Sequence, residues 1–195
     1  MMEPPFTHIT PLVQELEHVL TPYLDLPFLF FGYSLGALIA FELTRQLRRN
    51  NLPGPNRLFV AAHRAPQLPH STPTLHNLPN AEFINALYKL GGTPEAVLQH
   101  EELMQMLLPV LRADFSIYET YVYSDEAPLS CPLTVFGGEE DPDVRVQELA
   151  PWREQTTGQF NINILPGNHF FLHSNQDLLL GLITHYLHEK TTPGG

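Results

Sequence analysis

A serine between two glycines is the residue whose setting most clearly predicts chemistry. Residues 32–36 match the pattern Gly-x-Ser-x-Gly, with Ser34 at the centre. An apolar run, 28–31, precedes the pattern and a helical pattern follows it, which is the strand, turn and helix that a nucleophile elbow requires. Such a turn strains the serine backbone and exposes its hydroxyl, and the two glycines let strand and helix approach closely. We therefore predict that Ser34 is a nucleophile and that Gly32 and Gly36 both stand at a close approach.

A histidine near the end of the chain is the predicted base. A serine hydroxyl is a poor nucleophile, so it needs a base within hydrogen-bond reach and a third group that orients the base. His169 lies in a loop directly after the predicted strand 160–165 and follows Pro166 and Gly167. The chain holds ten histidines, and this position after the last strand distinguishes His169 from the others.

An acidic loop after the predicted strand 132–136 offers the third group. Its carboxylates are Glu139, Glu140, Asp141 and Asp143. Asp141 is favoured because it precedes a proline, which biases its backbone toward the extended conformation. Its carboxylate would hold the His169 ring in the right tautomer. A solvated acidic loop without a catalytic role is the alternative.

Serine, acid and histidine follow one another in the chain, each just past the carboxyl end of a strand. This order predicts the α/β-hydrolase fold, a mostly parallel sheet flanked by helices. The backbone N–H of Leu35, the residue after the nucleophile, would supply one donor of the oxyanion hole. Chemistry of this kind calls for no cofactor and no metal.

Composition narrows the class of protein further. The 195 residues suit a single domain, 1–195, and the net charge of −11 argues against nucleic acid and anionic membranes as partners. No run approaches the roughly 18 apolar residues of a membrane span. The N-terminus does not resemble a signal peptide, and the single cysteine, Cys131, suits a reducing compartment. We expect a cytoplasmic protein.

Strands and helices alternate at both ends of the chain. The patterns predict helices over 10–20, 145–156 and 175–188, a helix directly after the elbow, and strands over 28–31, 57–62, 132–136 and 160–165. Positive residues close the helix after the elbow, where they suit its dipole, and we read Arg45, Arg48 and Arg49 as a solvated helix end.

Between residues 66 and 124 the alternation stops. Helical patterns run over 80–90, 94–99, 101–107 and 109–123, with Pro109 opening the last piece. Nearly sixty residues of helix are too many for a simple crossover, so we predict a helical lid inserted at about 66–124. A helical cap without functional motion is the alternative. The candidates for lining a site under the lid are Leu87, Leu107, Leu108, Leu111 and Phe115.

Several blocks of the sequence resemble one enzyme family. The blocks are residues 27–37 around the elbow, 63–66 (His-Arg-Ala-Pro), 108–115, 119–121, 137–142 (Gly-Gly-Glu-Glu-Asp-Pro) and 166–172 (Pro-Gly-Asn-His-Phe-Phe-Leu). They are similar to the type II thioesterases, the external editing enzymes of nonribosomal peptide and polyketide synthesis.

This resemblance implies hydrolysis of acyl groups from the phosphopantetheine thioester of carrier proteins through an acyl-enzyme on Ser34, with Asp141 and His169 completing the triad. Arg64 follows the strand 57–62 at its carboxyl end, where ligands bind in open α/β sheets. We hypothesise that Arg64 contacts the phosphopantetheine phosphate or the carrier protein; a structural salt bridge is the alternative.

Two features depart from the family pattern. Tyr33 stands where the family usually has histidine. The family also begins with a segment that carries the first strands and a loop with the second oxyanion donor, so the resemblance implies an N-terminally truncated domain. A catalytically weak remnant that only binds carrier protein or acyl chain therefore stays open as a second reading, and a generic carboxylesterase is the third.

Overall fold

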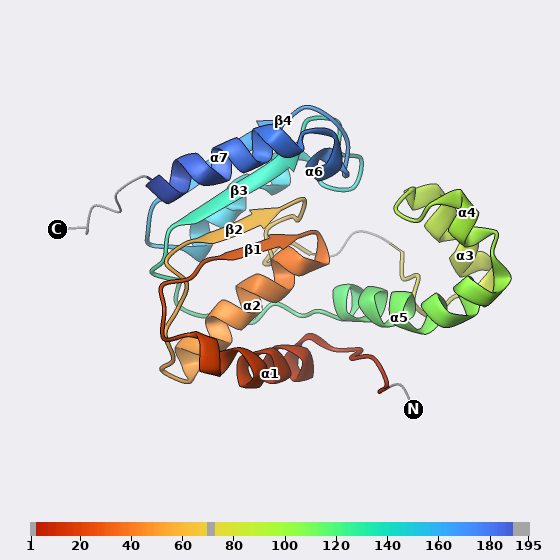
Figure 1. Cartoon of the computed structure of the whole chain (residues 1–195), viewed down its shortest axis with the longest axis horizontal. Helices are drawn as coiled ribbons and strands as arrows, with labels where there is room; N and C mark the ends of the chain where they lie inside the picture. The colour runs from red at the N-terminus through yellow and green to blue at the C-terminus, as the bar shows by residue number, and fades with distance from the viewer. Residues whose placement is uncertain (1–2, 70–72, 189–195) are drawn as a thin grey trace.

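The computed structural model describes residues 3–69 and 73–188 and centres on a parallel sheet (Figure 1). Its strands are β1 (Phe30–Tyr33), β2 (Leu58–Ala61), β3 (Leu133–Gly138) and β4 (Phe160–Leu165), and they lie side by side in that order. Every neighbouring pair is parallel. The predicted α/β class is confirmed.

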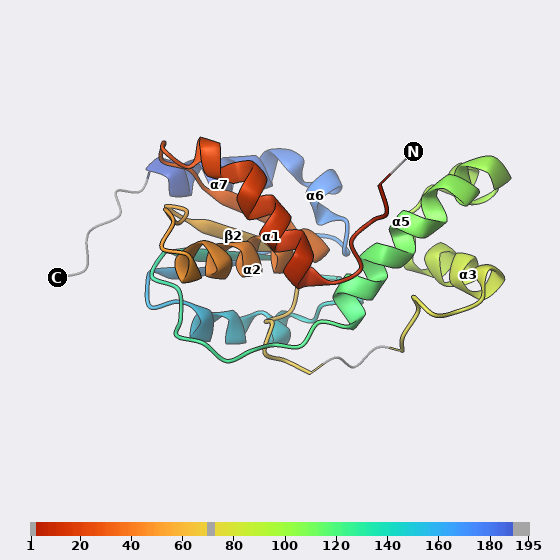
Figure 2. The ribbon, with the colours of Figure 1, turned by 90° about the horizontal axis from the view of Figure 1, so that it is seen from below.

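Helices cover both faces of the sheet (Figures 1 and 2). On one face lie α2 (Leu35–Arg49) and the two 3₁₀ segments η2 (Val146–Glu148) and η3 (Ala150–Gln155), which bury Phe41 and Trp152 against Val60 and Val135. On the other face lie α6 (Phe171–Ser174) and α7 (Gln176–His188), packed on the other sides of β2, β3 and β4. Helix α1 (Ile9–Leu20), followed by η1 (Thr21–Tyr23), packs against α2.

The segment between β2 and β3 extends beyond the carboxyl end of the sheet as a separate helical layer (Figure 2). It contains α3 (Asn80–Leu90), α4 (Glu95–Leu98) and α5 (Glu101–Glu119), so the predicted helical character is confirmed; residues 70–72 of the predicted insert lie outside the described residues. These helices share a small core of their own around Phe83, Leu87, Met104 and Leu108.

Pro109 does not open a new helix, and this prediction was wrong. Helix α5 runs continuously from Glu101 to Glu119 with Pro109 inside it. An internal proline typically costs about 3 kcal/mol. Here Met104 and Leu108 on one side of the proline and Phe115 on the other all pack into the core of the insert, and this shared packing keeps the two halves in line.

The predicted helix 145–156 is also corrected, because the structure has η2 and η3 in its place. Pro151 lies in the first turn of η3, where it has no N–H to continue a helix that began at Val146.

The basic end of α2 is not simply a solvated helix end. Arg45 is only 2% exposed, and its guanidinium binds the carboxylates of Glu42 and Glu126 at 2.7 and 2.8 Å. Arg48 and Arg49 also bind Glu126, at 2.8 and 2.6 Å. The three arginines therefore fasten the segment that returns from the insert to the sheet.

Within residues 3–69 and 73–188, no helix combines the length and the apolar character needed to cross a membrane.

Candidate active site

The elbow holds Ser34 in a backbone conformation that residues other than glycine rarely adopt. Its φ and ψ are 53° and −122°, so the predicted strain is present. Two hydrogen bonds fix the turn: the Ser34 N–H donates to the Ala61 carbonyl at 2.8 Å, and the Ala37 N–H donates to the Ser34 carbonyl at 3.0 Å. The turn thus connects the end of β1 to the first turn of α2 and is tied to β2.

The two glycines of the motif are not equivalent. A Cβ on Gly32 would lie 2.2 Å from the carbonyl oxygen of Gly36, so strand and helix do approach closely there. A Cβ on Gly36 would have no described atom within 4 Å. The predicted close approach of strand and helix is therefore present, between Gly32 and the backbone of Gly36, but it requires a glycine only at position 32, because a Cβ on Gly36 would point into open space.

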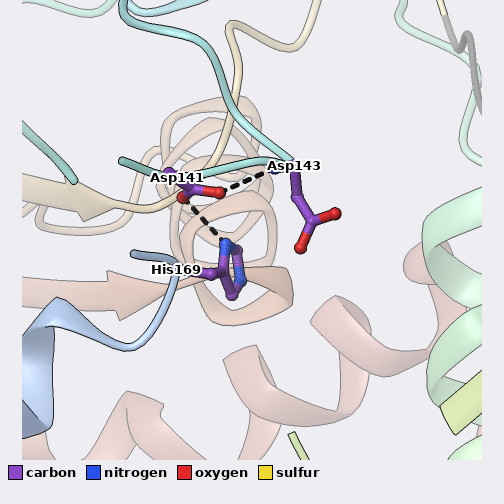
Figure 3. A group of neighbouring side chains, drawn as sticks. All are labelled: Asp141, Asp143 and His169. Atoms are coloured by element: carbon purple, nitrogen blue, oxygen red, sulfur yellow. Dashed lines mark hydrogen bonds and ion pairs between the residues drawn. The ribbon is translucent and has the colours of Figure 1, made fainter. Parts of the chain in front are cut away.

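Loops after three strands bring the serine, the histidine and an acid together. His169 Nε2 lies 3.1 Å from Ser34 Oγ, and His169 Nδ1 lies 2.9 Å from Asp141 Oδ2. Figure 3 shows the ring of His169 turned toward Asp141. A hydrogen-bonded chain of this kind allows the imidazole to accept the serine proton while the carboxylate orients the ring.

Asp141 is held from its other side by the backbone. Its Oδ1 accepts hydrogen bonds from the N–H groups of Asp143 at 2.8 Å and Val144 at 3.1 Å. The side chain of Asp141 is 0% exposed and that of His169 15%. Both carboxylate oxygens are therefore engaged, and the His169 ring has a fixed, nearly buried acceptor.

Glycines let the acid loop and the histidine loop touch. A Cβ on Gly138 would lie 2.6 Å from the carbonyl oxygens of both Gly167 and Asn168. Gly167 has a φ of +103°, which only glycine adopts easily. The N–H of Glu140 donates to the Gly167 carbonyl at 2.9 Å. These backbone contacts bring the two loops together and support the hydrogen bond between Asp141 and His169.

Leu35 is the first residue of α2, so its N–H is one of those that a helix leaves without an intrahelical acceptor. The positive end of the helix dipole lies at the same place. An oxyanion formed beside Ser34 would meet this N–H, as the sequence predicts.

A cavity of about 460 Å³ opens at Ser34, between the sheet and the insert. Its walls are mainly apolar. Leu87, Leu111 and Phe115 line it, as predicted, whereas Leu107 and Leu108 do not. Leu108 is buried in the core of the insert and Leu107 is exposed, so neither side chain faces Ser34. A cavity of this size and character suits an apolar acyl group.

The surroundings of the cavity change the pKa values of one tyrosine and two acids. Burial raises the pKa of Tyr33, an effect that the charge of Asp141 reinforces, so this phenol stays protonated. Partial burial also raises the pKa of Asp143 and of Asp114, which lines the cavity from α5. His169 opposes this rise at Asp143 and Asp141 adds to it.

Asp141, Asp143 and His169 have ligand atoms within 4.8 Å of one another, a spacing that a metal ion could use. However, the oxygens of Asp141 already accept three hydrogen bonds, one of them from the catalytic candidate His169. The hydrogen bond between Asp143 and Asp141 is made by the backbone N–H of Asp143 and not by its carboxylate (Figure 3). We assign this cluster to the orientation of His169.

Arg64 lies beside the site, but its side chain turns inward. The residue is 6% exposed, and its Nη1 donates to the Pro69 carbonyl at 2.7 Å. It lines a neighbouring cavity rather than the one at Ser34. A contact between Arg64 and a carrier protein stays a prediction.

Two contributions to the site were missed at the level of sequence. The N–H groups of Asp143 and Val144 hold Asp141, and only their place directly after the acid could have pointed to them. His63 lines the cavity from the loop after β2. Its position past the carboxyl end of a strand was a usable signal, the same one that singled out His169.

Comparison with known proteins agrees with the fold. The family model of the thioesterase domain matches residues 1–187. Linear gramicidin dehydrogenase LgrE of Brevibacillus parabrevis is 46% identical over 185 residues, which are 93% of this chain and 70% of LgrE. Gramicidin S biosynthesis protein GrsT of Aneurinibacillus migulanus is 44% identical over 174 residues, which are 89% of this chain and 68% of GrsT.

A solved structure gives the same result. The type II thioesterase BorB from the borrelidin biosynthetic cluster superposes with a TM-score of 0.85 at 36% identity, over 95% of this chain and 75% of BorB. LgrE is named a dehydrogenase, yet the turn after β1 here has Gly-x-Ser-x-Gly rather than the Gly-x-Gly-x-x-Gly of a dinucleotide site. The turn after β1 in this chain therefore lacks the dinucleotide-binding motif that a dehydrogenase of the Rossmann type would have there.

Fold and site together define a serine hydrolase of the α/β-hydrolase class. Within that class, the chain belongs to the thioesterase family.

Proposed function

We propose that the protein hydrolyses acyl groups from the phosphopantetheine thioester of carrier proteins in nonribosomal peptide or polyketide synthesis. The observation that carries this proposal is the hydrogen-bonded chain from Ser34 through His169 to Asp141 at the edge of an apolar cavity. The relatives support the biosynthetic setting, because GrsT is named for gramicidin S biosynthesis and BorB comes from the borrelidin cluster.

Acylation is the first half of the proposed reaction. Ser34 Oγ attacks the thioester carbonyl carbon while His169 Nε2 takes the hydroxyl proton. The carbonyl oxygen becomes an oxyanion beside the Leu35 N–H. When the tetrahedral intermediate collapses, the carbon–sulfur bond breaks, and His169 returns the proton to the departing phosphopantetheine thiolate. Asp141 stabilises the imidazolium throughout.

Deacylation repeats the same steps with water. His169 removes a proton from a water molecule that attacks the acyl-Ser34 ester, and then gives that proton to Ser34 Oγ. The products are a free acid and a regenerated enzyme. The carrier protein leaves with a free thiol, ready to be loaded again.

Carrier proteins bearing phosphopantetheine are thus the proposed partners, and an Arg64 contact with them is part of this proposal. We also propose that the insert 66–124 acts as a lid over the acyl site, and that the protein is cytoplasmic. The family match disfavours the generic carboxylesterase and the remnant that only binds.

Mass spectrometry of an acylated carrier protein tests the proposal. We expect wild type to remove the acyl mass and regenerate the free phosphopantetheine thiol, and Ser34→Ala to leave the acyl group in place. The matched simple ester of the same acid serves as the comparison substrate. Binding of the carrier without loss of the acyl group, or equal turnover of the simple ester, would contradict the proposal.

A further inference from the structure

A second cavity of about 220 Å³ lies directly beside the cavity at Ser34. Two side chains, His63 and Tyr118, line both cavities. The rest of the second cavity is formed mainly by apolar groups, among them Leu38, Pro66 and Leu68. Arg64 also lines this cavity, and no role beyond the proposed Arg64 contact has been assigned to it. The apolar part of its walls would suit the hydrocarbon part of an acyl group.

The rings of His63 and Tyr118 meet between the two cavities. Their centroids are 5.6 Å apart and their planes are nearly perpendicular, at 88°. His63 comes from the loop after β2, and Tyr118 comes from the last turn of α5. The contact therefore joins the loop after β2 to the insert, and both of its rings belong to the walls of the two cavities.

The histidine side of this contact is rigid. His63 is 5% exposed, and its Nδ1 lies 2.6 Å from the Arg64 carbonyl oxygen. The indole N–H of the fully buried Trp152 donates to the His63 carbonyl at 2.8 Å. A second ring contact, with centroids 6.4 Å apart, holds the imidazole against Trp152. The ring of His63 thus has little freedom to turn aside.

The tyrosine side is anchored through its neighbours on α5. Ser116 and Ile117 are buried. Glu119, the next residue after Tyr118, accepts hydrogen bonds from the N–H groups of Leu75 and His76 at 2.7 and 3.1 Å. This end of α5 is therefore fixed to the start of the insert, which holds the Tyr118 ring in contact with His63.

We infer that the His63–Tyr118 pair is a specificity-determining partition, which confines acyl groups to the first cavity and closes the second one to them. The inference rests on the proposed function, because it names the acyl groups that the same site accepts. Straight-chain groups that fit the first cavity are substrates, and groups that would need both cavities are rejected. Shortening one ring of the pair joins the cavities and admits the larger groups.

Length profiles of acyl-carrier hydrolysis test the partition, with variants that differ only in the ring. In wild type, kcat/KM should rise roughly fourfold per methylene, the equivalent of about 0.8 kcal/mol, up to a limiting length and then fall. Tyr118→Ala should move that limit to longer chains. Tyr118→Phe keeps the ring and should keep the limit. Tyr88→Ala, which removes a 57% exposed tyrosine of the insert, is the matched control.

Binding of a homologous series of straight-chain alkanols, measured by calorimetry, separates this inference from the proposed function. These probes are neutral and need no hydrolysis. If wild type hydrolyses no carrier-bound acyl group, the proposed function fails, while the alkanol series still decides the partition. His63→Ala opens the passage from the other side and replaces Tyr118→Ala if that variant does not fold. An unchanged length limit for alkanols in an opened and folded variant would overturn the inference.

Discussion

The carboxyl end of the sheet and the helical insert meet at one cavity, but they are held together in different ways. Around Ser34, Asp141 and His169 the geometry is fixed by backbone: positive φ angles, glycine contacts and N–H donors. The insert is held by side chains, namely a small apolar core and the bonds of Glu119. The catalytic geometry and the packing of the insert therefore depend on different kinds of contact, so variants of each region should fail in different ways.

The largest effect should come from the acid that orients the base. Asp141→Asn should lower turnover by about 10⁴, because the amide favours the wrong tautomer of His169. Glu140→Gln, which changes an exposed acid in the same loop, should leave turnover within a few-fold of wild type. Steady-state kinetics on an acyl-carrier substrate measures both. A greater loss in Glu140→Gln would move the acid to Glu140.

The two glycines of the elbow offer a matched pair. Gly32→Ala should lower the free energy of unfolding by at least about 1–3 kcal/mol, because its Cβ would collide with the Gly36 carbonyl. Gly36→Ala should be neutral or stabilising by up to about 1 kcal/mol, because it adds a helix-favouring residue in open space. Urea unfolding measures the two changes. Equal losses of unfolding free energy in the two variants would show that the contact at Gly32 is not the one that restricts the side chains of the elbow.

A substitution that destabilises the insert should leave the stability of the sheet unchanged. Glu119→Ala leaves the N–H groups of Leu75 and His76 without their acceptor, which typically costs about 1–3 kcal/mol. Hydrogen exchange should therefore speed up in residues 75–119 while the four strands keep their protection. Glu102→Ala, an exposed acid at the start of the same helix, should change neither region. Equal losses in strands and insert would mean that the two regions unfold as one unit.

The smallest effect concerns pH. The folded protein raises the pKa of Asp143, chiefly by partial burial of a side chain that remains exposed in part, so the folded state holds this proton more tightly than the unfolded state. The stability from that proton is complete below the unfolded pKa and is lost as pH rises through the folded pKa. Asp143→Asn should therefore be more stable than wild type at neutral pH, and the gain should vanish on acidification. Thermal unfolding across pH checks this, with Asp25→Asn, an exposed acid outside the acidic loop, as control. A gain that persists in acid would contradict the prediction.

The difference between the sheet end, held by backbone, and the insert, held by side chains, also explains which features the sequence could predict. Ser34, Asp141 and His169 stand in local patterns, each just past a strand, and the order of these patterns follows from a parallel sheet. Local patterns could not foresee that packing on both sides would carry α5 through Pro109. Nor could they show that Leu108 faces the core of the insert, away from Ser34. Arg45 was misread for a similar reason, because Glu126 lies far along the chain and only the fold brings it near.

Labelling of Ser34 tests the central claim most directly. A serine-directed fluorophosphonate should add a single adduct to wild type, and intact-protein mass spectrometry with peptide mapping should place it on Ser34. Ser34→Ala should show no adduct, whereas Ser130→Ala, which removes an exposed serine hydroxyl, should label like wild type. Undiminished labelling of a folded Ser34→Ala variant would contradict the claim that Ser34, activated by His169, is the nucleophile.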